Sequence, residues 1–586
     1  MEPTATHQFF RGLKNLPQPP RFAMSEAQRF LLLSILIGVF AGLLIVCFHC
    51  AIDFMSWYTL GTPAGSSWVR TLLSPVLGGA ASSLLVLFVF RKATGSGVNH
   101  TKAAIYIFEG YVPSSTVAGK FAACSVSLGT GTPLGPEDPA LQMGAGIASL
   151  LGRLFRISRS SMRMIAPVGA AAGIAAAFNT PITAVLFVIE EVVGAWNAGV
   201  LGSIILAAVS AVVVSRSFLG DQPLFRVPLF ELRDPAELLV YALIGVSGGL
   251  LSVLFVRAIE HLKRRAERLP RWTVYVRSAA AGLLVGLVGL FQPEVMGVGY
   301  ESIDSALHNH FPWDTMLILA AAKICLTAIC FSAGTPGGMF APSLFIGAMA
   351  GGGIGALAHQ YWPLATSSAS SYVLVGMGTF FAGVFRAPMT SIFMVFELSA
   401  SYMIILPVMT ANMMSYLVSR SLQRSPFFDL VARMEGMNLP SSEEMRERPR
   451  LRVEQAMDAD TPTVLRADTT VKRAIEEMRT HGAEWRLVWS ASGIWSLAEL
   501  GTLEADGDGQ RTISEAIPLT PLPRVYPDLA LDSALRQFGP YPALPVCSRA
   551  HPDQLLGVLT LEGIHRAYGI GQQPGETSAG PPRLTD

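Results

Sequence analysis

Long apolar stretches recur along the first three quarters of this chain, and they limit the possible fold more than any other feature. Two examples are "FLLLSILIGVFAGLLIVCF" from Phe30 and "TMLILAAAKICLTAICF" from Thr315. A helix that crosses a bilayer needs about 20 mostly apolar residues, and several stretches reach that length. Others, such as "FMVFEL", are short and interrupted by Gly and Pro, as in broken helices surrounded by protein. With 51% apolar residues, 15% charged residues and a mean hydropathy of +0.44, the chain is predicted to contain an all-α polytopic membrane domain.

Basic residues predict which parts face the cytoplasm. Arg11, Lys14, Arg21 and Arg29 precede the first span, and residues 257–277 contain seven Lys or Arg. The positive-inside rule places both segments in the cytoplasm, so we expect residues 1–29 to be a cytoplasmic segment of a protein in a bacterial-type inner membrane. The net charge of +1 gives no reason to propose a nucleic-acid partner.

Six cysteines show no disulfide framework. "CFHC" at 47–50 lies inside the first apolar stretch without a second pair of metal ligands, so buried free thiols are expected. We predict no metal site and no cofactor.

Two internal repeats divide the chain. "GAAAGIAAAFNTPITAVLFVIEE" from Gly169 returns without a gap as "GMGTFFAGVFRAPMTSIFMVFEL" from Gly376, and "GPEDP" from Gly135 aligns with "GMFAP" from Gly338. The membrane domain, 30–430, is therefore predicted to contain two related halves, about 30–220 and 235–425. In transporters, such halves commonly form a substrate site near the middle of the bilayer.

A second repeat follows a polar linker at 431–452. The sequence from Val453 matches the sequence from Ile513, and each copy predicts an amphipathic helix followed by short apolar strands. We predict an α/β pair at 453–570 and a disordered tail at 571–586.

Three glycine-rich segments have the composition of an anion site. They are "TGSGVN" with Gly95 and Gly97, "GPEDP" with Gly135 and Pro139, and "GTPGGMFAP" with Gly338 and Pro342. A helix N-terminus offers free N–H groups and about half a positive charge, which binds an anion without trapping it. Each segment alone could instead be a tight turn or a helix-packing position.

Glu137 is costly at membrane depth unless it pairs or faces water. At a helix N-terminus its carboxylate would compete with a transported anion and leave on protonation, which would link proton and anion movement. The alternative is an ordinary acid in an exposed loop.

These segments resemble the CLC family of chloride channels and chloride/proton exchangers. "GSGVN" is similar to the family's GSGIP segment, "GPEDP" to G(K/R)EGP and "GGMFAP" to GxFxP, and the repeated helix pair is the family's most recognisable feature. The resemblance covers about 30–430. It implies a homodimer in which each subunit has an anion pathway built from two inverted repeats, and the C-terminal pair resembles cytoplasmic CBS domains.

The resemblance also implies roles for individual residues. Glu137 matches the external gating glutamate and Glu191 the internal proton-transfer glutamate of exchangers. Lys120 matches a lysine that sets the electrostatics of the path. The groups implied to bind chloride are the Ser96 hydroxyl and the backbone N–H groups of Met339 and Phe340.

Four residues depart from the family pattern. Phe428 takes the place of a chloride-binding tyrosine and has no hydroxyl, so we expect looser chloride binding. Asn99 replaces a proline, and Pro136 and Asp138 replace the residues that flank the gate. We expect Asp138 to be a solvent-facing acid of the outer vestibule, and the alternative is a second proton-accepting group.

The resulting prediction is chloride/proton antiport, with a passive chloride channel as the alternative. No HExxH or GxSxG motif indicates an enzyme. The resemblance to CBS domains also implies adenine nucleotide as a partner of the pair. Nucleotide-binding copies carry an aspartate at the end of the second strand motif. At that position the copy with "GVLTLEG" has Gly563, and the copy with "GIWSLAE" has Glu499. A membrane-anchored nucleotide sensor is a third reading.

Overall fold

The computed structural model describes residues 26–61, 67–106, 108–194, 198–221, 224–225, 227, 234–363, 366–437, 439, 441, 443, 451–459, 464–490, 493–506, 508–527, 529–539, 541–548 and 553–567. The chain forms two compact units, Met1–Met445 and Arg446–Asp586. The predicted tail at 571–586 and most of the N-terminal segment lie outside the described residues.

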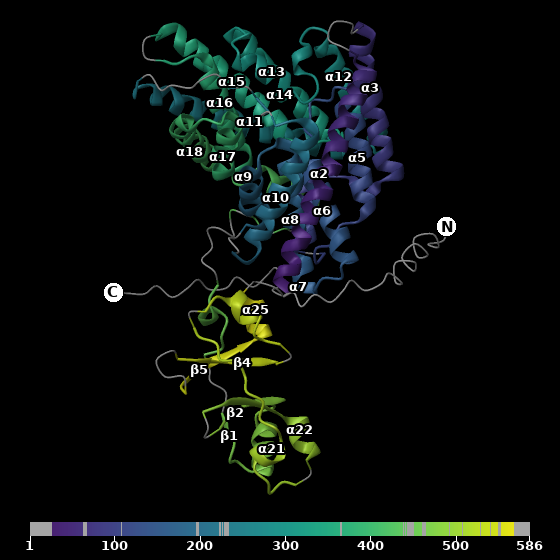
Figure 1. Cartoon of the computed structure of the whole chain (residues 1–586). Coiled ribbons are helices and arrows are strands. Elements are labelled where there is room, and N and C mark those ends of the chain that lie inside the picture. The colour runs from purple at the N-terminus through teal and green to yellow at the C-terminus, as the bar shows by residue number, and fades with distance from the viewer. Residues whose placement is uncertain are drawn as a thin grey trace. The chain divides into compact units, whose positions relative to one another are not determined.

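Among its described residues the first unit consists of helices joined by short loops (Figure 1). Its first half contains α2 (Glu26–Thr59), α3 (Trp68–Leu84), η2 (Leu85–Val89), η3 (Arg91–Ala93), α4 (Gly97–Tyr106), α5 (Ser114–Gly129), α6 (Glu137–Leu154), α7 (Arg159–Arg163), α8 (Ile165–Phe178), α9 (Pro181–Phe187), η4 (Val188–Val193) and α10 (Ala198–Leu219). Its second half contains α11 (Glu237–Arg268), η5 (Arg271–Tyr275), α12 (Arg277–Gly289), η6 (Pro293–Val295), α13 (Tyr300–Leu307), α14 (Trp313–Ser332), α15 (Phe340–Tyr361), α16 (Ala369–Phe385), α17 (Pro388–Ser399), η7 (Tyr402–Ile404), α18 (Ile405–Leu422) and α19 (Phe427–Met434).

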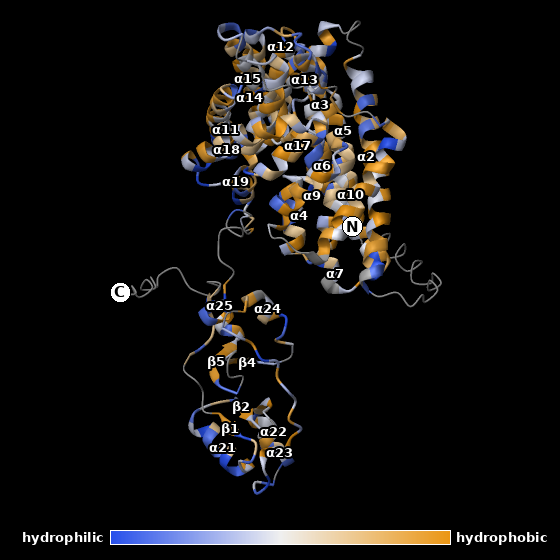
Figure 2. Ribbon diagram, turned by 60° about the vertical axis from the view of Figure 1, so that its left-hand side comes forward, coloured by the Kyte–Doolittle hydropathy of each residue, from blue (hydrophilic) through white to orange (hydrophobic). Residues whose placement is uncertain are grey.

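Eight helical stretches of the described residues are long and apolar enough to cross a membrane. Large apolar side chains remain exposed on their outer faces, for example Leu77 on α3 and Leu239 on α11. Figure 2 shows hydrophobic residues along these helices, whereas α21 (Val471–Thr480) of the second unit is largely hydrophilic. Exposed apolar faces of this extent suit a lipid environment. The predicted all-α membrane unit is confirmed.

The two halves exchange equivalent contacts. The Glu190 carboxylate accepts hydrogen bonds from the backbone N–H and hydroxyl of Thr390, at 2.9 and 2.7 Å. Glu397, which aligns with Glu190, accepts the same two bonds from Thr183, at 2.7 and 2.6 Å. Each carboxylate thus caps a helix of the other half, α17 or α9, where N–H groups lack partners. Contacts that are reciprocal in this way indicate a two-fold axis between the halves. These reciprocal contacts agree with the predicted duplication.

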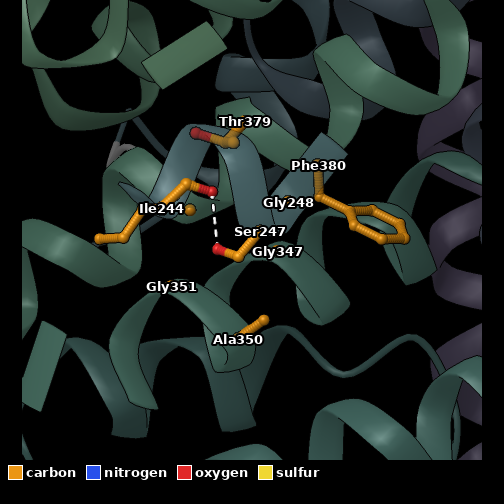
Figure 3. Close-up of a pocket in the computed structure, with 9 residues that line it drawn as sticks. Ile244, Ser247, Gly248, Gly347, Ala350, Gly351, Thr379 and Phe380 are labelled. Carbon is orange, nitrogen blue, oxygen red and sulfur yellow. Dashed lines mark hydrogen bonds between the residues drawn. The ribbon is translucent and has the colours of Figure 1, made fainter. Parts of the chain in front are cut away.

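Close glycine packing repeats across the same axis. A Cβ atom at Gly144 would collide with the Gly169 carbonyl oxygen, and one at Gly347 would collide with that of Gly376. α6 therefore packs directly on the backbone of α8, and α15 on that of α16. A small cleft remains beside the second contact, lined by Ile244, Ser247, Gly248, Gly347, Ala350, Gly351, Gly376, Thr379 and Phe380 (Figure 3). Because this cleft has no charged lining residue, it is a packing gap between helices.

The second unit repeats one helix–strand–strand–helix pattern. The first copy contains η8 (Val453–Gln455), β1 (Leu465–Arg466), α21 (Val471–Thr480), β2 (Trp485–Trp489), β3 (Trp495–Glu499) and α22 (Leu500–Ala505). The second contains α23 (Ile513–Ala516), α24 (Leu531–Leu535), β4 (Ala543–Cys547), β5 (Leu555–Thr560) and α25 (Leu561–Ala567). β2 lies between β1, which is parallel to it, and β3, which is antiparallel, and β4 pairs antiparallel with β5.

The aligned positions of the two copies are buried in equivalent cores. Val471, Ala474 and Met478 lie in one core. Their partners at an offset of 60 residues, Leu531, Ala534 and Phe538, lie in the other. A third cluster, which includes Leu487, Trp495, Leu522, Ala543, Cys547 and Val558, joins the two copies. This burial agrees with the predicted C-terminal repeat.

Candidate functional site

The candidate site lies where α6 of the first half meets α15 of the second. Gly135 and Gly338, which immediately precede these helices, pair in an antiparallel bridge with N···O distances of 2.8 and 2.7 Å. Because the two glycines are equivalent in the repeat, the bridge lies at the two-fold axis. It brings the N-termini of α6 and α15 together inside the unit, where both are buried.

Glu137, the first residue of α6, is fully buried. It accepts a hydrogen bond from the Tyr300 hydroxyl, and its Oε2 lies 3.4 Å from the backbone nitrogen of Ala341 in the first turn of α15. The carboxylate therefore takes the position of an anion at a helix N-terminus. An ordinary acid in an exposed loop, the alternative considered for Glu137, is ruled out by this burial. Tyr300 was missed in the sequence, although "GVGY" at 297–300 matches "GSGV" at 95–98 in its two glycines.

Asp138 is buried, with only 3% of its surface exposed, so the expectation of a solvent-facing acid is wrong. Its carboxylate lies at the N-terminus of α4, where Gly97 N donates to Oδ2 at 2.9 Å and Val98 N to Oδ1 at 2.9 Å. The Ser96 hydroxyl donates to Oδ1 at 3.2 Å. The physical reason is that unpaired N–H groups of a buried helix start attract the nearest carboxylate. Ser96, predicted to bind chloride, thus contacts Asp138.

Two buried lysines hold the turns that precede helices. Lys120 on α5 donates to the Gly95 carbonyl at 2.6 Å, just before α4. Lys323 on α14 donates to the carbonyls of Val295 and Gly297, at 2.9 and 2.8 Å, just before α13. Lys120 and Lys323 are equivalent when "GPEDP" is aligned with "GMFAP". Each lysine thus fixes the backbone turn that leads into a helix N-terminus. Lys323 was missed in the sequence, although its alignment with Lys120 in the repeat is a signal that both lysines have equivalent places.

The remaining predicted chloride contacts lie in an aromatic cluster. The Phe428 ring stacks on Phe385 with centroids 5.0 Å apart and lies 6.0 Å from the Phe340 ring. The carbonyl of Phe428 accepts a hydrogen bond from the Asn99 side chain at 2.9 Å, which accounts for the asparagine. Met339 is the N-cap residue of α15. This side of the site offers backbone groups and ring edges but no hydroxyl from position 428.

Proline and glycine fix how these helices begin. Pro136 is the N-cap residue of α6, and Pro139 lies in its first turn, where a missing N–H costs no hydrogen bond. Pro342 has the equivalent place in α15. A Cβ atom at Gly97 would collide with the backbone carbonyl of Asp138, so only glycine lets α4 approach α6 this closely.

Glu191 lies apart from this site, in the π-helical segment η4. Its Oε1 is 2.5 Å from the Lys102 ammonium, and both side chains are almost completely buried. Asp429 lies 3.7 Å from the same ammonium and accepts a hydrogen bond from Ser441 at 2.5 Å. Lys102 was missed, although a lysine in an apolar helix is a signal of function by itself.

Cysteines and metals add nothing to the site. Cys47, Cys50 and Cys325 are exposed, which corrects the expectation of buried thiols, because they lie on outward faces of α2 and α14. Within the described ranges, no group of three His, Cys, Asp or Glu side chains could hold a metal ion.

A family comparison decides which proteins the chain is related to. The sequence model of the family described as "Voltage gated chloride channel" matches residues 78–420, more than half of the chain. The chain belongs to this CLC family. The resemblance seen in its glycine-rich segments is confirmed, and membership places it among ion-transport proteins rather than enzymes.

Individual CLC proteins agree with this placement. A putative ClcB-like chloride channel protein of Ralstonia nicotianae is 32% identical over 397 residues, which cover 66% of this chain and 92% of that protein. A ClcA H+/Cl− exchange transporter of Vibrio cholerae is 29% identical over 415 residues, 68% of this chain and 88% of that protein. The crystal structure of a slow cyanobacterial Cl−/H+ antiporter matches with a TM-score of 0.65 and 24% identity, covering 70% of this chain and 99% of that one. This last likeness concerns the fold.

Proposed function

We propose that this protein exchanges chloride for protons across a membrane, with Glu137 as the gating carboxylate. The observation that carries the proposal is the place of its side chain, which is fully buried between the N–H of Ala341 and the Tyr300 hydroxyl. A carboxylate in the position of an anion can be replaced by chloride once it takes up a proton. Similarity to the ClcA exchangers supports exchange over passive conduction.

The other predicted residues take complementary roles in this proposal. The N–H groups at Met339 and Phe340 and the hydroxyl of Ser96 bind chloride farther along the path, and Lys120 adds a positive potential. Glu191 passes protons from the opposite side. Its pairing with Lys102 compensates for the loss of solvation of the Glu191 carboxylate in the protein interior.

A passive chloride channel is the second candidate function. The observation in its favour is Phe428, which is buried in the aromatic cluster and offers no hydroxyl to chloride. A looser binding position would let chloride pass without waiting for a proton.

We also propose the following organisation. The membrane domain spans about 30–430, with inverted halves at about 30–220 and 235–425, and it forms a homodimer in the lipid of a bacterial-type inner membrane. The linker expected at 431–452 is shorter, because α19 continues to Met434 and the first unit to Met445. A cytoplasmic CBS pair at 453–570 follows it. The two halves are supported by the equivalent caps that Glu190 forms with Thr390 and Glu397 forms with Thr183. The C-terminal pair is supported by its repeated helix–strand–strand–helix pattern.

Proton flux in sealed liposomes tests the exchange. The full chain is reconstituted, a chloride gradient is imposed and proton movement is followed with an internal pH dye. Wild type is compared with Glu137→Gln, with Glu191→Gln and with a matched control, Glu301→Gln, which removes an exposed acid of α13. Wild type and the control should move protons uphill, whereas the two site variants should carry chloride alone. Chloride flux without proton movement in wild type would refute exchange and favour the channel.

A further inference from the structure

The buried carboxylate of Asp138 fills the N-terminus of α4. It receives three hydrogen bonds, from Gly97 N and Val98 N at 2.9 Å and from the Ser96 hydroxyl at 3.2 Å. No cation pairs with it among the described residues within 4.0 Å. Its negative charge is balanced by helix-terminus dipoles and by Lys120, whose ammonium lies 2.6 Å from the Gly95 carbonyl at the same turn.

The same donors suit a chloride ion. Two adjacent N–H groups and a hydroxyl at a helix start form an anion site of partial charges, and one anion uses them at a time. Asp138 is held there by the backbone of α6, so its carboxylate is present at a high effective concentration. A free chloride ion therefore meets a position that the chain itself already occupies.

We propose that Asp138 is a tethered anion that competes with chloride for Ser96, Gly97 and Val98, and so sets the chloride affinity of the pathway. This rests on the proposed chloride transport and adds a second carboxylate to it. Glu137 and Asp138, consecutive in sequence, then occupy two different anion positions, one at α15 and one at α4. Chloride enters the α4 position only when Asp138 turns away or takes up a proton from solvent, which converts its carboxylate into a neutral acid.

The surroundings leave the side chain little choice of position. The Cβ of Asp138 would lie 2.7 Å from a Cβ built at Gly338, so the side chain is packed between α4 and the segment before α15. Since a swing is sterically restricted, protonation is the more direct way to release the donors.

Several ionisable groups surround Asp138. Those that interact with it electrostatically are Glu137 of α6, Cys124 of α5 and His100 of α4. Lys120 and Glu435 act on His100 from the same side. On the α15 side the nearest residues, Met339 to Ala341, carry no charge. Glu137 is the acid whose titration must be separated from that of Asp138.

Chloride binding to the purified full chain in detergent tests the proposal without any transport step. Isothermal titration compares wild type with Asp138→Asn, which keeps the shape of the side chain and removes its charge. If Asp138 occupies its donors for 90–99% of the time, removing the competition lowers the chloride dissociation constant about 10- to 100-fold. The matched control is Asp314→Asn, an exposed acid in the first turn of α14, and it should bind like wild type. An unchanged or weaker affinity in Asp138→Asn, with or without lower thermal stability, would assign Asp138 a helix-capping role only and overturn the proposal.

A second measurement decides the matter even if Asp138→Asn does not fold. In Glu137→Gln, the remaining carboxylates at the two helix starts are Asp138 and Glu435, which lies beside Gly95. Proton uptake on chloride binding from weakly buffered solution is therefore expected in Glu137→Gln and also in Glu137→Gln/Glu435→Gln, where Asp138 alone remains. No uptake in Glu137→Gln would contradict the proposal. A failure of chloride-driven proton flux in liposomes would instead count against the proposed exchange, since the binding experiment does not depend on it.

Discussion

Replacing Lys102 by methionine should destabilise the protein strongly, because it removes the cation from a buried charge cluster. The Lys102 ammonium lies 2.5 Å from Glu191 and 3.7 Å from Asp429, and the exposed fractions of the Lys102, Glu191 and Asp429 side chains are 1%, 2% and 8%. Methionine fills nearly the same volume, so the main change is the loss of charge.

The size of the effect follows from this burial. Removing one partner of a buried ion pair costs about 3–5 kcal/mol, because the other charge stays in a poorly solvating environment. A partly exposed pair gives a matched comparison. Lys263 lies 3.3 Å from Glu435, with 17% and 19% of the side chains exposed, and Lys263→Met should cost at most about 1 kcal/mol.

Denaturant titration of the full chain in mild detergent measures these differences in the free energy of unfolding. The double variant Lys102→Met/Glu191→Gln should recover part of the loss, since the unpaired carboxylate is gone. Equal costs for Lys102→Met and Lys263→Met, or no recovery in the double variant, would refute this account of the cluster.

Three further outcomes are expected. Glu397→Gln should lower the free energy of unfolding by about 1–3 kcal/mol, because its carboxylate accepts two bonds from Thr183, and thermal unfolding would measure the loss. Gly144→Ala should reduce folded yield in size-exclusion chromatography, because its new methyl group would collide with the Gly169 carbonyl, and a normal yield would contradict that packing. Burial raises the pKa of the Cys547 thiol to about 11. Alkylation of this thiol should therefore be slow at neutral pH, accelerate as the pH rises and become rapid in urea, which mass spectrometry of its peptide would follow.

The sequence was sufficient to predict the helical membrane unit, and its internal repeats led to the proposed duplication and C-terminal pair. These features depend on hydrophobic stretches and on self-similarity, which are properties of the linear chain. The equivalent helix pairs that begin at Gly169 and Gly376 aligned without a gap, and the structure joins them through reciprocal caps.

The side-chain partners could not be predicted in the same way. Tyr300 contacts Glu137 across 163 positions, and Lys102 contacts Glu191 across 89. Such pairs form only once the halves have packed, and no local pattern specifies them. The position of Asp138 was predicted wrongly for a related reason. Its surroundings were inferred from the neighbouring gate residue, whereas successive residues at a helix start point in different directions.

The helices α6 and α15 are equivalent in the two halves, but the side chains at their N-termini are not. The two-fold axis gives α6 and α15 equivalent N-termini, and either could receive an anion. However, Glu137 has Phe340 as its counterpart, and Asp138 has Ala341. Both acids therefore come from the first half, and the Glu137 carboxylate reaches an N–H group of the second. The two carboxylates therefore lie at the starts of α15 and α4, whereas the second half contributes no acid at the matching positions, Phe340 and Ala341.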